Sequence, residues 1–217
     1  MLPIANLLRD AGLSTPEAQA QGRALLECHA LTRAGKQNIA VVKVERARAL
    51  LASQLRRVCA DADCEQLAAA RWPEKELVRV APSHCDLCGG SSQRRAARLL
   101  AEALQQAGIS RVLLLGGTPP QHTTLRDLLA DDPVALRMID GSLRAHSGAE
   151  AAQQLVWAQL LVVWASTPLH HKVSVAYTGQ VPPGLPVLTV ARRGVESLCR
   201  GVAAQVRRRH TRVIALS

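Results

Sequence analysis

From about Leu77 onward, short apolar runs alternate along the chain with longer stretches that have the apolar spacing of helices. This alternation is typical of strands connected by helices. The runs VLLLGG and QLLVVWAS lack the polar alternation of half-exposed strands, which indicates strands covered on both faces, as in parallel sheets. The sequence therefore predicts an α/β fold in which a parallel sheet lies between two layers of helices.

The same patterns give the expected elements of this region. Strands are predicted at 77–81, 111–115, 135–139, 160–164, 186–190 and 213–216. Helices are predicted at 93–107, 121–129, 148–158, 169–177 and 194–208. Right-handed crossovers place the loops after the strands along one edge of the sheet, where ligands bind in such folds.

The N-terminal part is predicted as a helical region at 1–76, followed by an α/β domain at 77–217. No convincing strand occurs in 1–72, and Ser14-Thr15-Pro16-Glu17 has the residue types that cap a helix. A long amphipathic helix is predicted at 37–58. The short polar turn at 31–36 makes this helix and the one before it resemble a helical hairpin or a helix-turn-helix.

Four cysteines form two closely spaced pairs, Cys59 with Cys64 and Cys85 with Cys88. The pattern C-x4-C-x20-C-x2-C is close to that of small structural zinc sites, where four thiolates surround the ion as a tetrahedron. Gly89 and the glycine that follows it permit the tight backbone turn of a zinc knuckle. We therefore predict a structural zinc site that joins the helical region to the α/β domain.

Other readings of the cysteines remain open. His84 can replace one thiolate, Cys59 and Cys64 can be ordinary helix residues, and the CxxC pair can be a redox or incidental pair. Cys28 and Cys199 lie in apolar helical patterns and are predicted to be buried thiols.

The loops after the predicted strands carry the candidate ligand-binding residues. They are Gly116, Gly117, Thr118, Asp140, Ser166, Thr167, His171, Lys172 and Arg192. Helix N-terminal amides and Lys172 would hold a phosphorylated ligand, Asp140 would accept a hydrogen bond from a ribose hydroxyl, and His171 would titrate near neutral pH. The glycines can equally serve a tight turn, Asp140 can cap a loop, and His171 and Lys172 can face solvent. The turn lacks the third glycine of a dinucleotide fingerprint and the lysine of a P-loop.

The chain is basic, with a formal net charge of +10. Residues 1–90 carry 12 basic and 10 acidic side chains, whereas residues 91–217 carry 15 and 7. This excess favours partners that carry phosphate, and Arg207, Arg208 and Arg209 are candidate nucleic-acid contacts. Cations also favour helix C-termini, which explains the same run without a partner. Aromatic residues make up only 2%, which argues against stacking of single-stranded bases.

The CxxC-Gly-Gly-Ser segment, the strand with its Gly-Gly turn, and residues 136–141 and 164–172 together resemble a group of poorly characterised bacterial proteins. These proteins have small Rossmann-like domains, preceded here by a CxxC zinc knuckle, and the resemblance covers roughly residues 84–205. It implies a Rossmann-like α/β domain and a role linked to nucleotides or nucleic acids.

We predict that the chain is a zinc-stabilised accessory protein that binds nucleic acid or a nucleotide and belongs to a larger bacterial assembly. An enzyme acting on a nucleotide or phosphorylated metabolite is the alternative, although catalytic motifs such as Gly-x-Ser-x-Gly and His-Glu-x-x-His are missing. A scaffold subunit that docks on a protein partner is the third reading. No signal peptide or membrane-spanning run is evident, so a cytoplasmic location without membrane contact is expected.

Overall fold

The computed structural model describes residues 1–140, 148–165 and 171–214, and the side chains of 171–174 and 212–214 lie outside this description. The chain divides into two compact units, Met1–Arg95 (unit 1) and Ala96–Ser217 (unit 2). The sequence-based boundary at residue 76 lies earlier. Unit 1 continues past it because the strand after residue 76 pairs with a strand at 55–58. Each unit is described by itself.

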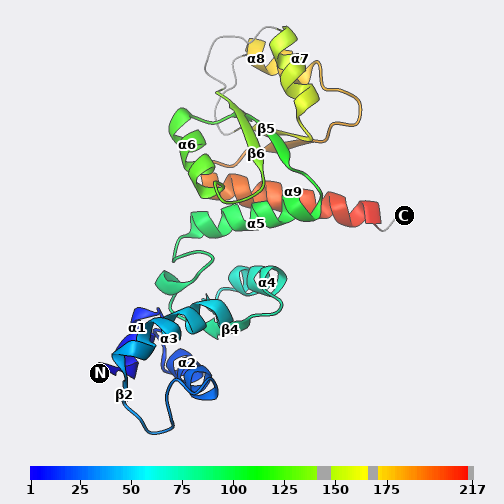
Figure 1. Ribbon diagram of the computed structural model, residues 1–217. Coiled ribbons are helices and arrows are strands. Elements are labelled where there is room, and N and C mark those ends of the chain that lie inside the picture. The colour runs from blue at the N-terminus through cyan, green and yellow to red at the C-terminus, as the bar shows by residue number, and fades with distance from the viewer. Residues whose placement is uncertain (141–147, 166–170, 215–217) are drawn as a thin grey trace. The chain divides into compact units, whose positions relative to one another are not determined.

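Unit 1 combines helices with two small sheets (Figure 1). Its elements are β1 (Leu2–Pro3), α1 (Ile4–Asp10), α2 (Pro16–Cys28), β2 (Asn38–Ile39), α3 (Val41–Gln54), β3 (Leu55–Val58), α4 (Ala62–Arg71) and β4 (Glu76–Arg79). A 3-10 turn follows at Pro82–His84. Strand β1 pairs antiparallel with β2, and β3 pairs parallel with β4. Buried side chains of α1, α2 and α3 form one core together with Leu55, Val78 and Val80.

The predicted cap of the second helix is confirmed. Thr15 is the N-cap of α2, its side chain accepts a hydrogen bond from the Ala18 amide at 3.1 Å, and Pro16 follows as the first helical residue. The Ser14 hydroxyl accepts instead from the Ala81 amide at 3.1 Å. The start of α2 is therefore attached to the chain just after β4.

Three predictions for unit 1 are wrong. Residues 1–72 were predicted to contain no strand, but β1, β2 and β3 lie there. The helix predicted at 37–58 ends at Gln54, and residues 55–58 form β3, because Leu55 and Val58 are buried and the segment pairs with β4. The short turn predicted between the helices is a connection from His29 to Ala40 that contains β2. A helix-turn-helix joins its helices through about three or four residues, so this pair is not one.

Unit 2 contains a four-stranded parallel sheet with the strand order β6-β5-β7-β8. Its elements are α5 (Ser92–Gln106, which begins in unit 1), β5 (Arg111–Gly116), α6 (Pro119–Leu128), β6 (Ala135–Ile139), α7 (Gly148–Trp157), β7 (Leu160–Trp164), α8 (His171–Thr178), β8 (Val187–Val190) and α9 (Val195–Ile214). The predicted α/β class and parallel sheet are confirmed.

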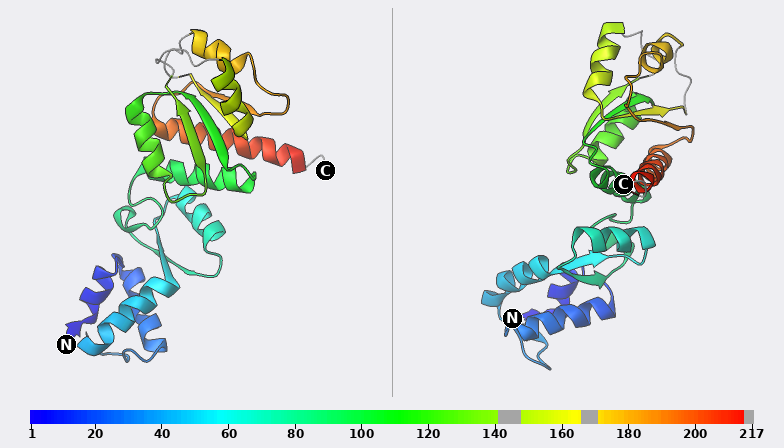
Figure 2. Two further views of the ribbon diagram at one scale, coloured as in Figure 1. Left: turned by 45° about the horizontal axis from the view of Figure 1, so that its top comes forward. Right: turned by 90° about the vertical axis from the view of Figure 1, so that its right-hand side faces the viewer.

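Helices cover both faces of this sheet. Leu113, Leu115, Leu161 and Val163 point toward one layer, where they pack with buried residues of α7 and with Tyr177 of α8. Figures 1 and 2 show α5 and α9 on the opposite side. The alternate residues of β5 and β7 face that side and are also buried, which explains why the strands have continuous apolar sequences.

Two further strand predictions need correction. The strand at 77–81 exists as β4, but it belongs to the small sheet of unit 1 and not to the four-stranded sheet. The strand predicted at 213–216 is wrong at its start, because α9 continues to Ile214, and residues 215–217 lie outside the described part. Within the described ranges, no helix has both the length and the apolar character needed to cross a bilayer.

Candidate functional site

The four paired cysteines meet at one buried point of unit 1. Cys59 follows β3, Cys64 lies in α4, and Cys85 and Cys88 lie in the loop after the 3-10 turn. Their sulfur atoms all lie within 4.8 Å of one another, and those of Cys59 and Cys88 are 3.8 Å apart. A tetrahedron with metal–sulfur bonds of about 2.3 Å has sulfur–sulfur edges of about 3.8 Å. The four thiols can therefore hold one metal ion.

The loop that carries the CxxC pair is shaped by its two glycines. Gly89 and Gly90 have φ angles of +52° and +82°, which other residues rarely adopt. This turn lets the Gly90 amide donate to the Cys88 sulfur at 3.4 Å. The Ser91 hydroxyl then accepts from the Arg94 amide at 3.2 Å and caps α5. The predicted tight knuckle and the helix cap after it are confirmed.

The thiols have unequal proton affinities. Burial raises the pKa of Cys59 and of Cys64 above the ordinary thiol value. Burial acts in the same direction on Cys85, but backbone amides, that of Cys88 foremost, donate to its sulfur and lower its pKa. Amide donors of this kind stabilise a thiolate, which is the form that binds a metal.

Arg95 places a positive charge beside the cluster. Its guanidinium pairs with Asp61, the N-cap of α4, and the sulfurs of Cys88 and Cys64 favour its charged form. Its desolvation is outweighed by these partners, so the pKa of Arg95 is raised. A divalent ion with four thiolates has a net charge of −2, and Arg95 offsets part of it.

Asp86, between the two knuckle cysteines, fixes the loop to β3. Its carboxylate accepts from the Arg57 amide at 2.8 Å and from Arg57 Nε at 2.9 Å, and its own amide donates to the Arg57 carbonyl at 2.9 Å. Arg57 Nη1 donates to the Ala11 carbonyl at 3.0 Å. The knuckle is thereby connected to the end of α1.

The positions of the cysteines and of His84 test several of the predictions. All four ligands lie in unit 1, two of them before and two after the predicted boundary at residue 76. His84 is exposed and is not part of the cluster. Cys199 is buried as predicted, but the prediction for Cys28 is wrong, because it lies on the exposed side of α2. Buried thiols that surround one point favour metal binding over redox exchange.

The predicted ligand residues of unit 2 are brought together only in part. Strands β5, β6 and β8 run parallel, so Gly116, Asp140 and Arg192 lie at or just after the same ends of these strands. Ser166 and Thr167 lie outside the described residues, and so do the side chains of His171 and Lys172. Ligand binding by this set stays a prediction.

The Gly-Gly turn is closely packed. A Cβ at Gly117 would lie 2.6 Å from the ring of Trp164, which is fully buried and whose Nε1 donates to the Arg192 carbonyl at 2.9 Å. His122 Nε2 is 2.8 Å from the Gly116 carbonyl. The turn thus has a packing role at this end of the sheet.

The first turn of α6 has no free amide for a phosphate. Pro119 and Pro120 have no N–H, the Gln121 amide is bound by Thr118 in a capping box, and the His122 amide donates to the Thr118 carbonyl at 3.0 Å. The amide of Thr118 itself donates to the Gln121 side chain at 3.0 Å. The amide contacts predicted for a ligand here are therefore taken by the protein.

A groove of about 480 Å³ lies between β8 and α9. It is lined by Arg192 and Arg208, which the sequence assigned to different ligands, and by Arg200, which the sequence analysis missed. Of the other predicted arginines, Arg209 donates to the Val187 carbonyl at 2.9 Å and Arg207 is half-buried. Arg200 and Arg208 belong to α9, whereas Arg192 lies in the loop between β8 and α9, so no helical spacing in the sequence connects the three.

Comparison with known proteins gives no match to this chain among protein-family models, curated proteins or solved structures. The cysteine cluster and the surfaces of the two units are therefore the features from which a function can be inferred.

Proposed function

We propose that this protein is a zinc-stabilised nucleic-acid-binding protein, with a Rossmann-like α/β unit that contacts phosphates through the groove between β8 and α9. The observation that carries the proposal is the convergence of Arg192, Arg200 and Arg208 on this groove. Glu196 also lines it and pairs with Arg200 at 3.1 Å. The lining side chains have a net charge of +2.

Zinc is the metal that the cysteine cluster supports best. Four sulfur donors in a tetrahedron favour zinc or iron, and the sulfurs here lie close enough to share a single ion. All four cysteines are buried, and no coordination position is left for a substrate, which is typical of a structural zinc site.

Metal analysis tests this assignment directly. Protein purified without chelators should contain about one zinc per chain, and Cys88→Ser should lose it. Cys28→Ser, which changes an exposed thiol outside the cluster, is the matched control and should retain the metal. Iron in place of zinc, or no metal in the wild-type protein, would refute the assignment.

The groove favours phosphate contacts over base recognition. Gly201 and Ala204 lie among its lining residues, and none of the lining residues that the structure describes is aromatic, so these residues offer bases no ring to stack on. Arginines pair well with phosphate oxygens and carry no sequence information through such contacts. We therefore expect binding that depends strongly on salt and weakly on sequence.

The structure offers less support for nucleotide binding at the first turn of α6 and for catalysis in the groove. The backbone amides at the first turn of α6 already donate hydrogen bonds within the protein, so they are not available to a nucleotide. Catalysis in the groove would need a group to move protons. Among the described residues, its lining contains no histidine or cysteine, and the Glu196 carboxylate is paired with Arg200.

Titration of labelled duplex DNA and duplex RNA at several salt concentrations tests the proposal. The logarithm of affinity on DNA should fall against the logarithm of salt by about 0.9 per phosphate contacted. Replacing Arg192, Arg200 and Arg208 together with alanine should reduce that slope by up to about 2.7. The matched control replaces three exposed arginines outside the groove, Arg33, Arg46 and Arg126, and removes the same charge.

Two results would overturn the proposal. One is an absence of binding to both duplexes at low salt. The other is an equal loss of affinity in the groove variant and the control variant, which would indicate a nonspecific effect of net charge. Tight binding of ATP without binding of either duplex would favour the nucleotide reading instead.

A further inference from the structure

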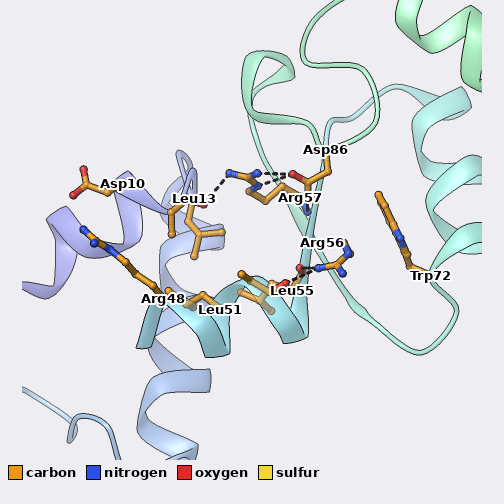
Figure 3. Close-up of a pocket in the computed structure, with 11 residues that line it drawn as sticks. Asp10, Leu13, Arg48, Leu51, Leu55, Arg56, Arg57, Trp72 and Asp86 are labelled. Carbon is orange, nitrogen blue, oxygen red and sulfur yellow. Dashed lines mark hydrogen bonds and ion pairs between the residues drawn. The ribbon is translucent and has the colours of Figure 1, made fainter. Parts of the chain in front are cut away.

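Unit 1 contains a second hollow, of about 490 Å³, which is separate from the cysteine cluster (Figure 3). Its lining comes from the end of α1, the second half of α3, β3, Trp72 and the knuckle residue Asp86. Leu13, Leu51 and Leu55 give it an apolar floor. Small-molecule sites have volumes of about 300–1,000 Å³ and are mostly apolar with a few placed polar groups. The hollow has both properties.

One wall is held rigidly by Arg57. Figure 3 shows its guanidinium between Asp86 and the end of α1, bonded to the Asp86 carboxylate and to the Ala11 carbonyl. A Cβ at Gly12 would lie only 2.1 Å from Arg57 Nη1, so glycine is needed there for the arginine to reach across. Because Arg57 is fully engaged with Asp86, its charge is neutralised within the protein.

Arg56 has a different environment. Its guanidinium lies over the Trp72 ring, with its central carbon 5.4 Å from the ring centroid. Nη1 donates to the Ala52 carbonyl at 2.6 Å and to the Leu55 carbonyl at 2.9 Å, which fixes the group at the end of α3. Among the residues that the structure describes, no carboxylate pairs with Arg56. Its positive charge is therefore available to a ligand.

The charge at the opposite rim is slightly negative, because Asp10 and Glu45 together outweigh Arg48. Asp10 and Arg48 lie on the same side of the hollow in Figure 3, and Arg48 also pairs with Glu45 at 2.9 Å. An anionic group would be repelled by Asp10 and attracted by Arg56. The anionic end of a ligand is thus directed to the Trp72 side, and its apolar body to the leucine floor.

We propose that this hollow binds a small aromatic acid, with the carboxylate on Arg56 and the ring over Leu51 and Leu55. A planar ring suits the site because it can lie flat on the apolar floor that the leucines provide. A carboxylate suits it because the unused Nε and Nη2 donors form the fork that binds two oxygens. This proposal is independent of nucleic-acid binding by unit 2.

Calorimetric titration with 2-naphthoate tests the proposal, and the neutral amide 2-naphthamide is the matched probe of equal shape. Naphthoate should bind at one site, at least about tenfold more tightly than naphthamide, because a charge-assisted hydrogen bond is lost in the amide. Arg56→Ala should weaken naphthoate binding by about tenfold or more and leave naphthamide unchanged. Arg46→Ala, which changes an exposed arginine of α3 outside the hollow, should change neither.

The comparison of the two probes on the wild-type chain does not depend on any variant folding correctly. Equal affinity for naphthoate and naphthamide, or no saturable binding of either, would overturn the proposal. An equal loss in Arg46→Ala and Arg56→Ala would also overturn it, since general charge attraction would then explain the binding. If Arg56→Ala does not fold, as judged by circular dichroism, Arg56→Gln provides the same test with a side chain closer in size.

Discussion

Replacing Gly117 with alanine should destabilise unit 2 through two separate effects. The φ angle of Gly117 is +82°, and a side chain in that region costs about 1–2 kcal/mol. The new Cβ would also lie 2.6 Å from Cε3 of Trp164, so the ring would have to move. Movement would break the 2.9 Å hydrogen bond from Trp164 to the Arg192 carbonyl, which adds about 1–3 kcal/mol if the buried indole N–H loses its partner.

A control separates the two effects. Gly184 has a φ angle of +87°, but an added Cβ there has no neighbour within 4 Å. Gly184→Ala should therefore cost only the backbone strain, about 1–2 kcal/mol, whereas Gly117→Ala should cost about 2–5 kcal/mol. Both variants gain the same small amount from the less flexible unfolded chain, which cancels in the comparison.

Urea unfolding followed by tryptophan fluorescence provides the measurement. A Trp72→Phe background leaves Trp157 and Trp164 as reporters, both in unit 2. If Gly117→Ala costs no more free energy of unfolding than Gly184→Ala, the packing role assigned to the Gly-Gly turn is refuted. The turn would then have room for a ligand, and the ligand role predicted from sequence would regain support.

Two further outcomes follow from the buried charges and thiols. Arg95→Gln should weaken zinc retention by about 10–100-fold in competition with a chelator, because the charge beside the thiolates is lost, while Arg94→Gln on the exposed side should not. Burial raises the pKa of Cys199 to about 12 from 9.0. The free energy of unfolding is unaffected by this thiol below pH 9, where it is protonated in both states. As pH rises from 9 toward 12, the thiol ionises in the unfolded chain before it does in the folded one, so the free energy of unfolding falls by up to about 4 kcal/mol. Urea unfolding of Cys199→Ala should show a correspondingly weaker loss over this range than the wild-type protein.

The four-stranded sheet was predictable because local patterns determine its strands. Each of β5 to β8 lies within one residue of its predicted limits. In β5 and β7 the signal is strongest, because both faces are buried and the apolar runs are unbroken. The strand order β6-β5-β7-β8 was not predictable, because the connecting helices allow several orders of parallel strands. Strand order depends on contacts between distant segments.

The candidate sites also differ in how far the sequence alone predicts them. The cysteine cluster was predictable because short spacing within each pair places two sulfurs on one turn. The hollow beside Arg56 was not predictable from the sequence. Its lining residues are scattered from Asp10 to Asp86, and none of them stands out from the sequence around it. Arg200 was missed because a single arginine on a helix usually faces solvent.

The error at residues 55–58 leads to a last prediction about how unit 1 folds. Residues such as Gln54, Leu55 and Arg56 are good helix formers, so local preference favours continuing α3, yet the chain turns into a strand. Three tertiary interactions favour the strand: pairing with β4, burial of Leu55 and Val58, and the bond from the Arg57 amide to Asp86 at 2.8 Å.

A peptide of residues 41–58 lacks all three interactions. In aqueous trifluoroethanol, its carbon chemical shifts should be helical continuously through Arg57, whereas the same positions in the full protein should show strand shifts. A peptide that turns extended after Gln54 on its own would contradict this reasoning, because the strand would then be encoded locally. A helical peptide would mean that the knuckle residue Asp86 and β4 select the conformation of β3. The wall of the hollow formed by Arg57 would then exist only once that part of the chain has folded.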